Sequence, residues 1–222
     1  MSNTLHNEIK KEFQLERLIF FSDAVFAIAI TLLVIEIRIP DVHEAVNDHV
    51  LLQSLGHLVP KFVGFLISFM LIGLYWSVHH RMFGFVTSYN RRLILLNLLF
   101  LFFIVLMPFS TGFYSEYAGP ELFIKQLKVP MTFYVLNFVG AGIVNFCMWL
   151  YITNPRHALT SPLIDPEVAK MAKIRALTVP MTFLLMLPVA YLFDVRIAVY
   201  VPMSIPIVLG ILKRIMIKKS KA

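Results

Sequence analysis

Six long runs of apolar residues alternate with more polar segments along the chain. A helix needs about 20 apolar residues to cross the hydrocarbon core of a bilayer. The pattern therefore predicts an all-α membrane protein. We expect residues 1–222 to form a single domain with six transmembrane helices, near 18–37, 58–78, 93–111, 129–152, 176–193 and 197–212. Prolines in the last two ranges favour kinks there, at Pro180, Pro188, Pro202 and Pro206.

The composition supports a membrane setting. Of the 222 residues, 59% are hydrophobic and 15% are charged, which is more apolar surface than a soluble domain of this length can hide in its core. The single cysteine, Cys147, excludes an intramolecular disulfide framework and a cysteine-rich metal site.

The 20 Lys and Arg residues are unevenly divided between the two sides of the predicted bundle. Fifteen lie in the terminal segments and in the connections on the same side: Lys10, Lys11, Arg17, Arg81, Arg91, Arg92, Arg156, Lys170, Lys173, Arg175, Lys213, Arg214, Lys218, Lys219 and Lys221. Five lie opposite: Arg38, Lys61, Lys125, Lys128 and Arg196. Because cytoplasmic loops are enriched in Lys and Arg, we expect both termini in the cytoplasm of a multi-pass plasma-membrane protein. We interpret the net charge of +7 as a topological signal beside the lipid bilayer, with no nucleic acid as partner.

Polar residues interrupt the apolar pattern toward that basic side. Arg17, Ser22 and Asp23 open the first predicted span, and an aspartate in hydrocarbon usually has a partner because it is costly to bury alone. The end of the second span and the start of the third bring further polar residues to the same level: Trp76, His79 and Asn97. We expect one buried network in which Asp23 pairs with Arg17 or a histidine, and whose main role is to hold the first three helices together.

Metal binding and catalysis have little support in the sequence. His79 and His80 are adjacent, so on a helix they point about 100° apart and cannot face one ion. The chain has no His-Glu-x-x-His pattern and no Gly-x-Ser-x-Gly elbow. We therefore expect no metal site, no cofactor and no enzymatic activity.

The middle of the first span carries a narrow apolar stripe. With Ile28 as the reference and about 100° per residue, Leu32 lies near +40°, Ile35 near −20° and Thr31 near −60°, whereas Asp23 lies near −140°. If the stripe faces a central axis, Asp23 therefore faces the helix bundle. Periodicity alone is also compatible with an ordinary lipid-facing or packing surface.

Four motifs in order resemble one family. Arg17-x-x-x-Phe21-Ser22-Asp23 is similar to the signature of the transmembrane protein 175 family, the endosomal/lysosomal and prokaryotic potassium channels. The other matches are Trp76-x-x-His79-x-Arg81-x-Phe83, Leu95-Leu96-Asn97-Leu98 and Pro108-Phe109. The resemblance is close over about the first half of the chain, and the second half matches by hydropathy only.

The resemblance implies a potassium-permeable cation channel that assembles as a homotetramer, with the pore lined by the first helix of each subunit. It places the first constriction at Ile28, completes it with Leu32 and Ile35, and makes Thr31 a pore-associated hydroxyl. A structural signature network is implied at Arg17, Phe21, Ser22, Asp23, Trp76, His79 and Asn97. The sequence has no Thr-Val-Gly-Tyr-Gly segment, so we expect a hydrophobic gate in place of a carbonyl selectivity filter, with potassium ions only transiently in the pore.

Two alternatives remain open at this stage. The protein could be a proton-permeable channel, or a secondary transporter that uses Arg17, Asp23 and the histidines. A transporter predicts polar residues at the midplane of broken helices, whereas the middle of the first span is apolar apart from Thr31.

Overall fold

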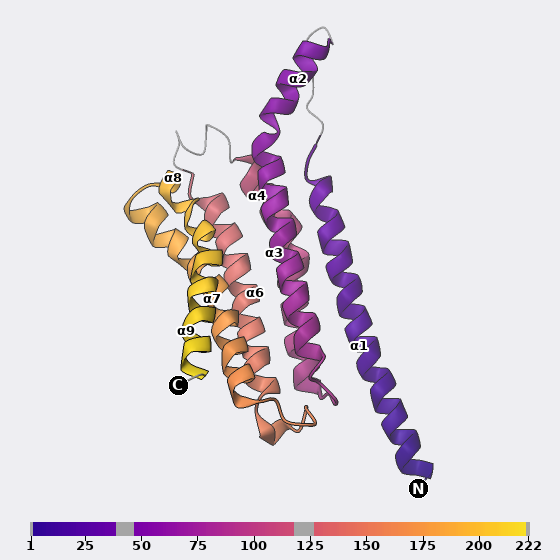
Figure 1. Cartoon of the computed structure of the whole chain (residues 1–222). Coiled ribbons are helices and arrows are strands. Elements are labelled where there is room, and N and C mark those ends of the chain that lie inside the picture. The colour runs from indigo at the N-terminus through magenta and orange to yellow at the C-terminus, as the bar shows by residue number, and fades with distance from the viewer. Residues whose placement is uncertain (1, 39–46, 118–126, 221–222) are drawn as a thin grey trace.

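The computed structural model describes residues 2–38, 47–117 and 127–220 (Figure 1). Within these ranges the regular secondary structure is helical, and five helices are long and apolar enough to cross a membrane. The long helices are α1 (Ser2–Ile35), α3 (Val59–Phe83), α4 (Arg91–Glu116), α6 (Val129–Ile152) and α7 (Pro166–Leu192). The shorter helices are α2 (Asp48–His57), η1 (Pro155–His157), α8 (Val195–Ala198), η2 (Val201–Ser204) and α9 (Ile205–Ser220). The chain is thus an all-α membrane protein, as the hydropathy pattern predicts.

Capping residues explain where several helices begin. The side chain of Asn90 accepts a hydrogen bond from the backbone N–H of Leu93 at the start of α4. Asp165 accepts two such bonds at the start of α7, from Glu167 and Val168. These contacts satisfy backbone donors that have no partner within the helix. Two of the Lys residues counted above for the distribution of charge, Lys125 and Lys221, lie outside the described residues.

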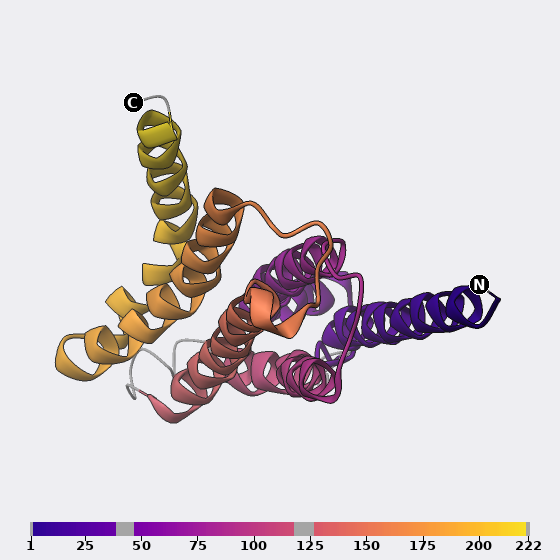
Figure 2. The same ribbon diagram turned by 90° about the horizontal axis from the view of Figure 1, so that it is seen from below.

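The helices pack in sequence, with α4 at the centre of the contacts. It packs against α1, α3 and α6, and α6 in turn packs against α7. Figure 2 shows α1 at one end of the molecule and α9 at the other. Because α1 lies at the edge, one of its sides has no neighbour among the described residues of the chain.

Small residues allow the close approach of α6 and α7. A Cβ atom added at Gly142 would lie 2.5 Å from Cγ of Pro180 on the facing helix. Glycine is common at such contacts between membrane helices because it lets the two backbones come close together. Next to this contact, the stacked rings of Phe138 and Phe183 fill the core, with their centroids 4.9 Å apart.

The last part of the chain is more broken than the first. The predicted span at 197–212 falls on parts of α8, η2 and α9 and is not one continuous helix. Pro202 lies in the first turn of η2 and Pro206 in the first turn of α9. Because proline has no N–H to donate, it fits at the start of a helix and interrupts a helix that would otherwise continue. The range 176–193 lies almost entirely within α7, which begins earlier, at Pro166.

Candidate functional site

One face of α1 attaches this helix to its own subunit. Its buried residues recur at helical spacing and form a single stripe, made of Leu15, Ser22, Phe26, Ala29 and Leu33. Because α1 contacts α3 and α4, this stripe is the side of α1 that the subunit covers. The rotation of α1 about its axis is therefore set by packing within the subunit.

The apolar stripe predicted from the sequence lies on the opposite face of α1. Ile28, Leu32 and Ile35 are exposed to 57%, 37% and 67%, and Thr31 is exposed beside them. The Thr31 hydroxyl lies 2.9 Å from the carbonyl oxygen of Ile28 and 3.1 Å from that of Ala27. It therefore donates to its own helix, as threonine in a membrane helix commonly does. No part of the subunit that the structure describes covers this stripe, so it is available for contact with another molecule.

A buried chain of hydrogen bonds joins α1, α4 and α3. The Asn97 amide donates to the Ser22 hydroxyl at 2.9 Å, and Ser22 donates to the carbonyl oxygen of Leu18 at 2.9 Å. His79 Nε2 donates to the Asn97 carbonyl oxygen at 2.8 Å. The side chains of Ser22, His79 and Asn97 are all 0% exposed. Three residues far apart in the sequence thus form one polar contact between three helices.

Aromatic rings enclose the histidine of this chain. The ring of His79 stacks on Phe83 and on Phe100, with centroids 4.4 Å and 5.7 Å away, and Phe26 lies at 5.5 Å. The motif at the end of the second predicted span includes Phe83 without giving it a role, and neither Phe26 nor Phe100 belongs to a motif identified in the sequence. Helical spacing could have found two of these phenylalanines, because Phe26 follows Ser22 by four residues and Phe83 follows His79 by four.

The prediction that Asp23 pairs with Arg17 or a histidine is wrong. Asp23 is half-buried and accepts a hydrogen bond from the indole Nε1 of Trp76 at 2.9 Å. Within the described ranges no ion pair joins Asp23 to Arg17, which is exposed at the start of the span. Trp76 also stacks on His80, with ring centroids 5.6 Å apart. Phe21 is exposed to 51%, so it takes no part in the buried chain.

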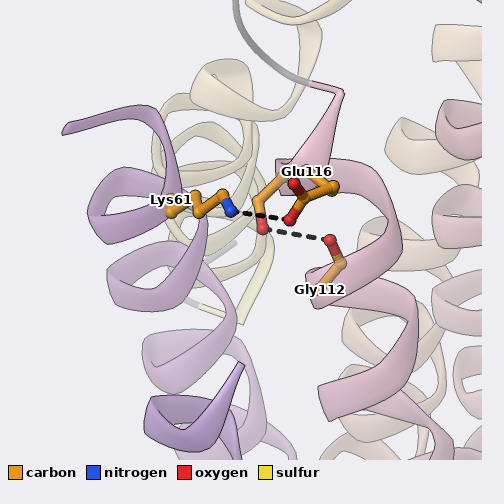
Figure 3. Close-up of polar contacts among 4 residues, drawn as sticks. Lys61, Gly112 and Glu116 are labelled. Atoms are coloured by element: carbon orange, nitrogen blue, oxygen red, sulfur yellow. Dashed lines mark hydrogen bonds and ion pairs between the residues drawn. The ribbon is translucent and has the colours of Figure 1, made fainter. Parts of the chain in front are cut away.

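At the opposite end of the bundle, α3 and α4 are joined by an ion pair. Lys61 Nζ lies 2.6 Å from Glu116 Oε2, and Ser115 donates to the carbonyl oxygen of Gly112 nearby (Figure 3). A Cβ atom added at Gly112 would overlap the carboxylate of Glu36, so glycine lets the end of α1 approach α4. Glu116 is largely exposed, and such pairs contribute about 1 kcal/mol or less.

The arrangement offers no metal centre among the residues that the structure describes. No three His, Cys, Asp or Glu side chains there come close enough to hold an ion. His79 uses its Nε2 for Asn97 and is surrounded by phenylalanine rings. The polar chain is therefore a contact between helices, and the exposed α1 stripe is the part of the site that faces outward.

The fold and site define a multi-pass helical membrane protein whose first helix has one face turned away from its own subunit. The family described as endosomal/lysosomal potassium channel TMEM175 matches residues 17–108. A potassium channel of Streptomyces collinus is 34% identical over 155 residues, covering 70% of this chain and 72% of that protein. The endosomal/lysosomal proton channel TMEM175 of Gallus gallus is 36% identical over 142 residues, covering 60% of this chain and 27% of that longer protein.

A solved structure agrees with these sequence matches. The crystal structure of a lysosomal potassium-selective channel TMEM175 homologue from Chamaesiphon minutus superposes with a TM-score of 0.73 and 29% identity. It covers 89% of this chain and 97% of that one. The chain belongs to the TMEM175 family, which consists of ion channels and not of enzymes. The resemblance seen in the sequence motifs is thereby confirmed.

Proposed function

We propose that this protein is a potassium-permeable cation channel, built as a homotetramer around a pore lined by α1. The observation that carries the proposal is the exposed stripe of Ile28, Thr31, Leu32 and Ile35 on an edge helix whose other face is buried. Four copies of this face around an axis would cover it. The bacterial relative from Streptomyces collinus, which is named a potassium channel, supports the choice of ion.

In this proposal the isoleucine and leucine rings form the gate. A narrow ring of branched apolar side chains excludes water, so an ion must lose part of its hydration shell to pass. Potassium holds its shell less tightly than sodium, so partial dehydration favours potassium, less sharply than several carbonyl sites in series would. Thr31 supplies the nearest hydroxyl, although its bond to the α1 backbone leaves the ring at Ile28 as the main barrier.

The signature residues have a positioning role in the same proposal. Ser22, His79 and Asn97 hold the buried face of α1 on α3 and α4, and Asp23 with Trp76 adds a second link between α1 and α3. Because α1 is one continuous helix, fixing its buried face also fixes the direction of the exposed stripe. Arg17 and Phe21 lie at the exposed start of the span, where lipid headgroups would surround them.

We further propose that each subunit is one domain that crosses the plasma membrane six times with both termini in the cytoplasm. The start of α1 and the end of α9 lie at the same end of the bundle in Figure 1, as an even number of crossings requires. The sixth crossing would combine the apolar segment Val195–Ile211 with the rest of α9. The excess of Lys and Arg on this side agrees with a cytoplasmic orientation.

Proton permeation is the second candidate. The relatives from Gallus gallus and Homo sapiens are named proton channels. In this chain His79 is the titratable member of a buried chain of hydrogen bonds, and buried histidines take part in proton relays in membrane proteins. A transporter that uses Arg17, Asp23 and the histidines has less support, because Arg17 is exposed and Asp23 is bound to an indole.

The test is ion flux into liposomes that contain the purified protein. Potassium, sodium and proton gradients are imposed in turn, and the subunit number of the same sample is measured by native mass spectrometry. We expect a tetramer that passes potassium faster than sodium. A flux of protons alone would favour the second candidate, and saturable transport coupled to a second solute would favour a transporter. A dimer or monomer that conducts would contradict the proposed pore.

A further inference from the structure

A cavity lies apart from the exposed α1 stripe, and α1 contributes no residue to its lining. It has a volume of about 670 Å³ and is formed by residues of α3, α6, α7 and α9. Much of its wall is apolar and includes Val78, Ala176, Val179 and Leu209. A hydrocarbon chain could lie along this wall, but two features of the cavity call for a polar ligand.

The first feature is a pair of buried polar atoms without partners. Asn145 and Trp149 line the cavity, and each residue is 2% exposed. Among the described residues, neither Asn145 Oδ1 nor Trp149 Nε1 has a hydrogen-bond partner. Buried polar groups in native proteins nearly always have a partner, and leaving one unsatisfied is costly. Solvent reaches neither atom in this structure. After a small rotation of the two side chains, one ligand hydroxyl could donate to Asn145 Oδ1 and accept from Trp149 Nε1.

The second feature is an excess of positive charge. Arg81 of α3 and Arg175 of α7 both line the cavity, together with the single carboxylate of Glu167. Arg175 is half-buried, and Arg81 and Glu167 are exposed. Two guanidinium groups against one carboxylate favour an anion, and arginine forms paired hydrogen bonds with phosphate oxygens.

These polar groups lie toward the basic end of the bundle, with Asn145 about one helical turn deeper than Trp149. Trp149 lies within one turn of the end of α6 and contacts Phe85 just beyond the end of α3, with ring centroids 6.3 Å apart. Across α6 and α7, Gly142 faces Pro180, which brings the following turns of α6 to the level of Arg175. In the six-span topology proposed above, this end of the bundle lies near the lipid phosphates, and the apolar wall continues toward the middle of the bilayer.

We propose that this cavity binds one molecule of phosphatidylglycerol. Its phosphate lies between Arg81 and Arg175, a headgroup hydroxyl lies between Trp149 and Asn145, and one acyl chain follows the apolar wall. Phosphatidylglycerol combines a net negative charge with headgroup hydroxyls, and both are needed here. Phosphatidylcholine has no hydroxyl to donate, and its trimethylammonium group would be repelled by the arginines. This lipid site does not depend on which ion the channel passes.

The experiment is native mass spectrometry of the purified protein with phosphatidylglycerol and phosphatidylcholine of identical acyl chains. We expect the wild-type protein to bind phosphatidylglycerol about tenfold more tightly, because only this lipid adds the headgroup hydrogen bond and it has no trimethylammonium group for the arginines to repel. Arg175→Gln should remove most of this preference. Trp149→Phe keeps an aromatic ring beside Phe85 and removes the donor, so it should weaken phosphatidylglycerol binding several-fold.

Arg92→Gln is the matched control. Arg92 is exposed in the first turn of α4 at the same end of the bundle and lies outside the cavity. We expect it to leave the lipid preference unchanged, and binding of phosphatidylcholine reports that each variant is folded. Equal binding of the two lipids by the wild-type protein would overturn the proposal. Water would then be the partner of the polar atoms beside the cavity. An equal loss in Arg92→Gln and Arg175→Gln would overturn it as well, because the attraction would be general to the basic surface.

Discussion

Replacing Asn97 by leucine tests whether the buried polar chain holds α1 in place. Leucine has nearly the shape of asparagine but forms no hydrogen bonds, so the change removes the contacts to Ser22 and His79 at 2.9 Å and 2.8 Å. Ser22 keeps its bond to the carbonyl oxygen of Leu18. His79 loses its only hydrogen-bond partner within the described part of the chain, because its Nδ1 already has none.

The expected cost follows from these contacts. A lost hydrogen bond costs about 1 kcal/mol, and a buried polar group left without a partner costs about 1–3 kcal/mol. Because Asn97 and His79 are 0% exposed, water cannot replace the missing partner. Hydrogen bonds between membrane helices are on average weaker than this, about 0.6 kcal/mol each. We therefore expect Asn97→Leu to lower the free energy of unfolding by about 2–4 kcal/mol.

The assay is unfolding in mixed micelles with increasing denaturing detergent, followed by tryptophan fluorescence. Asp23→Asn is the control on the same helix, because asparagine can still accept the hydrogen bond of Trp76 and the site is only half-buried. It should cost less than about 1 kcal/mol, and potassium selectivity should stay close to that of the wild type.

A double variant tests the physical reason. In Asn97→Leu with His79→Phe, both partners are replaced by apolar side chains, so no polar group is left unsatisfied. Such pairs are often nearly neutral, and a phenylalanine can stack on Phe83 and Phe100 as the histidine does. The double variant should be more stable than Asn97→Leu alone. A cost below about 0.5 kcal/mol for the single variant, or a double variant less stable than the single, would refute the reasoning.

Two further predictions concern the exposed stripe and the helix packing. Ile28→Asn and Ile28→Ala should raise single-channel potassium current, and Ile28→Asn should also weaken discrimination against sodium, because a polar or smaller ring is easier to wet. Ile30→Ala, on the half-buried side of α1, should leave current unchanged, and an effect at Ile30 alone would mean that another face lines the pore. Gly142→Ala should destabilise the protein by about 1–3 kcal/mol through overlap with Pro180, measured by thermal unfolding. Gly73→Ala is the control, because an added Cβ there meets no atom within 4 Å, and it should not destabilise the protein. Equal stability of the two variants would contradict the tight contact between Gly142 and Pro180.

Hydropathy alone predicted a helical membrane protein. It also predicted that the polar residues of the first three spans lie at similar heights along their helices. A crossing helix must be apolar over about 20 residues, and this local requirement is visible in any window of the sequence. The motifs around Ser22, Asp23, His79 and Asn97 also identified the family, which the relatives then confirmed. Helical spacing was enough to separate Ile28 from Asp23, because both lie on one helix and their relative angle is set by the helix itself.

The tertiary structure decided which polar groups pair and where the subunit is hollow. From the sequence, Asp23 was expected to pair with Arg17 or a histidine, but its partner is the indole of Trp76 on α3. Asn97 joins Ser22 and His79 from a third helix. Pairing of this kind depends on the rotation and height of three packed helices, and periodicity within one helix contains neither. The same holds for Trp149 and Asn145, which look like ordinary core residues until α3, α7 and α9 leave a cavity beside them.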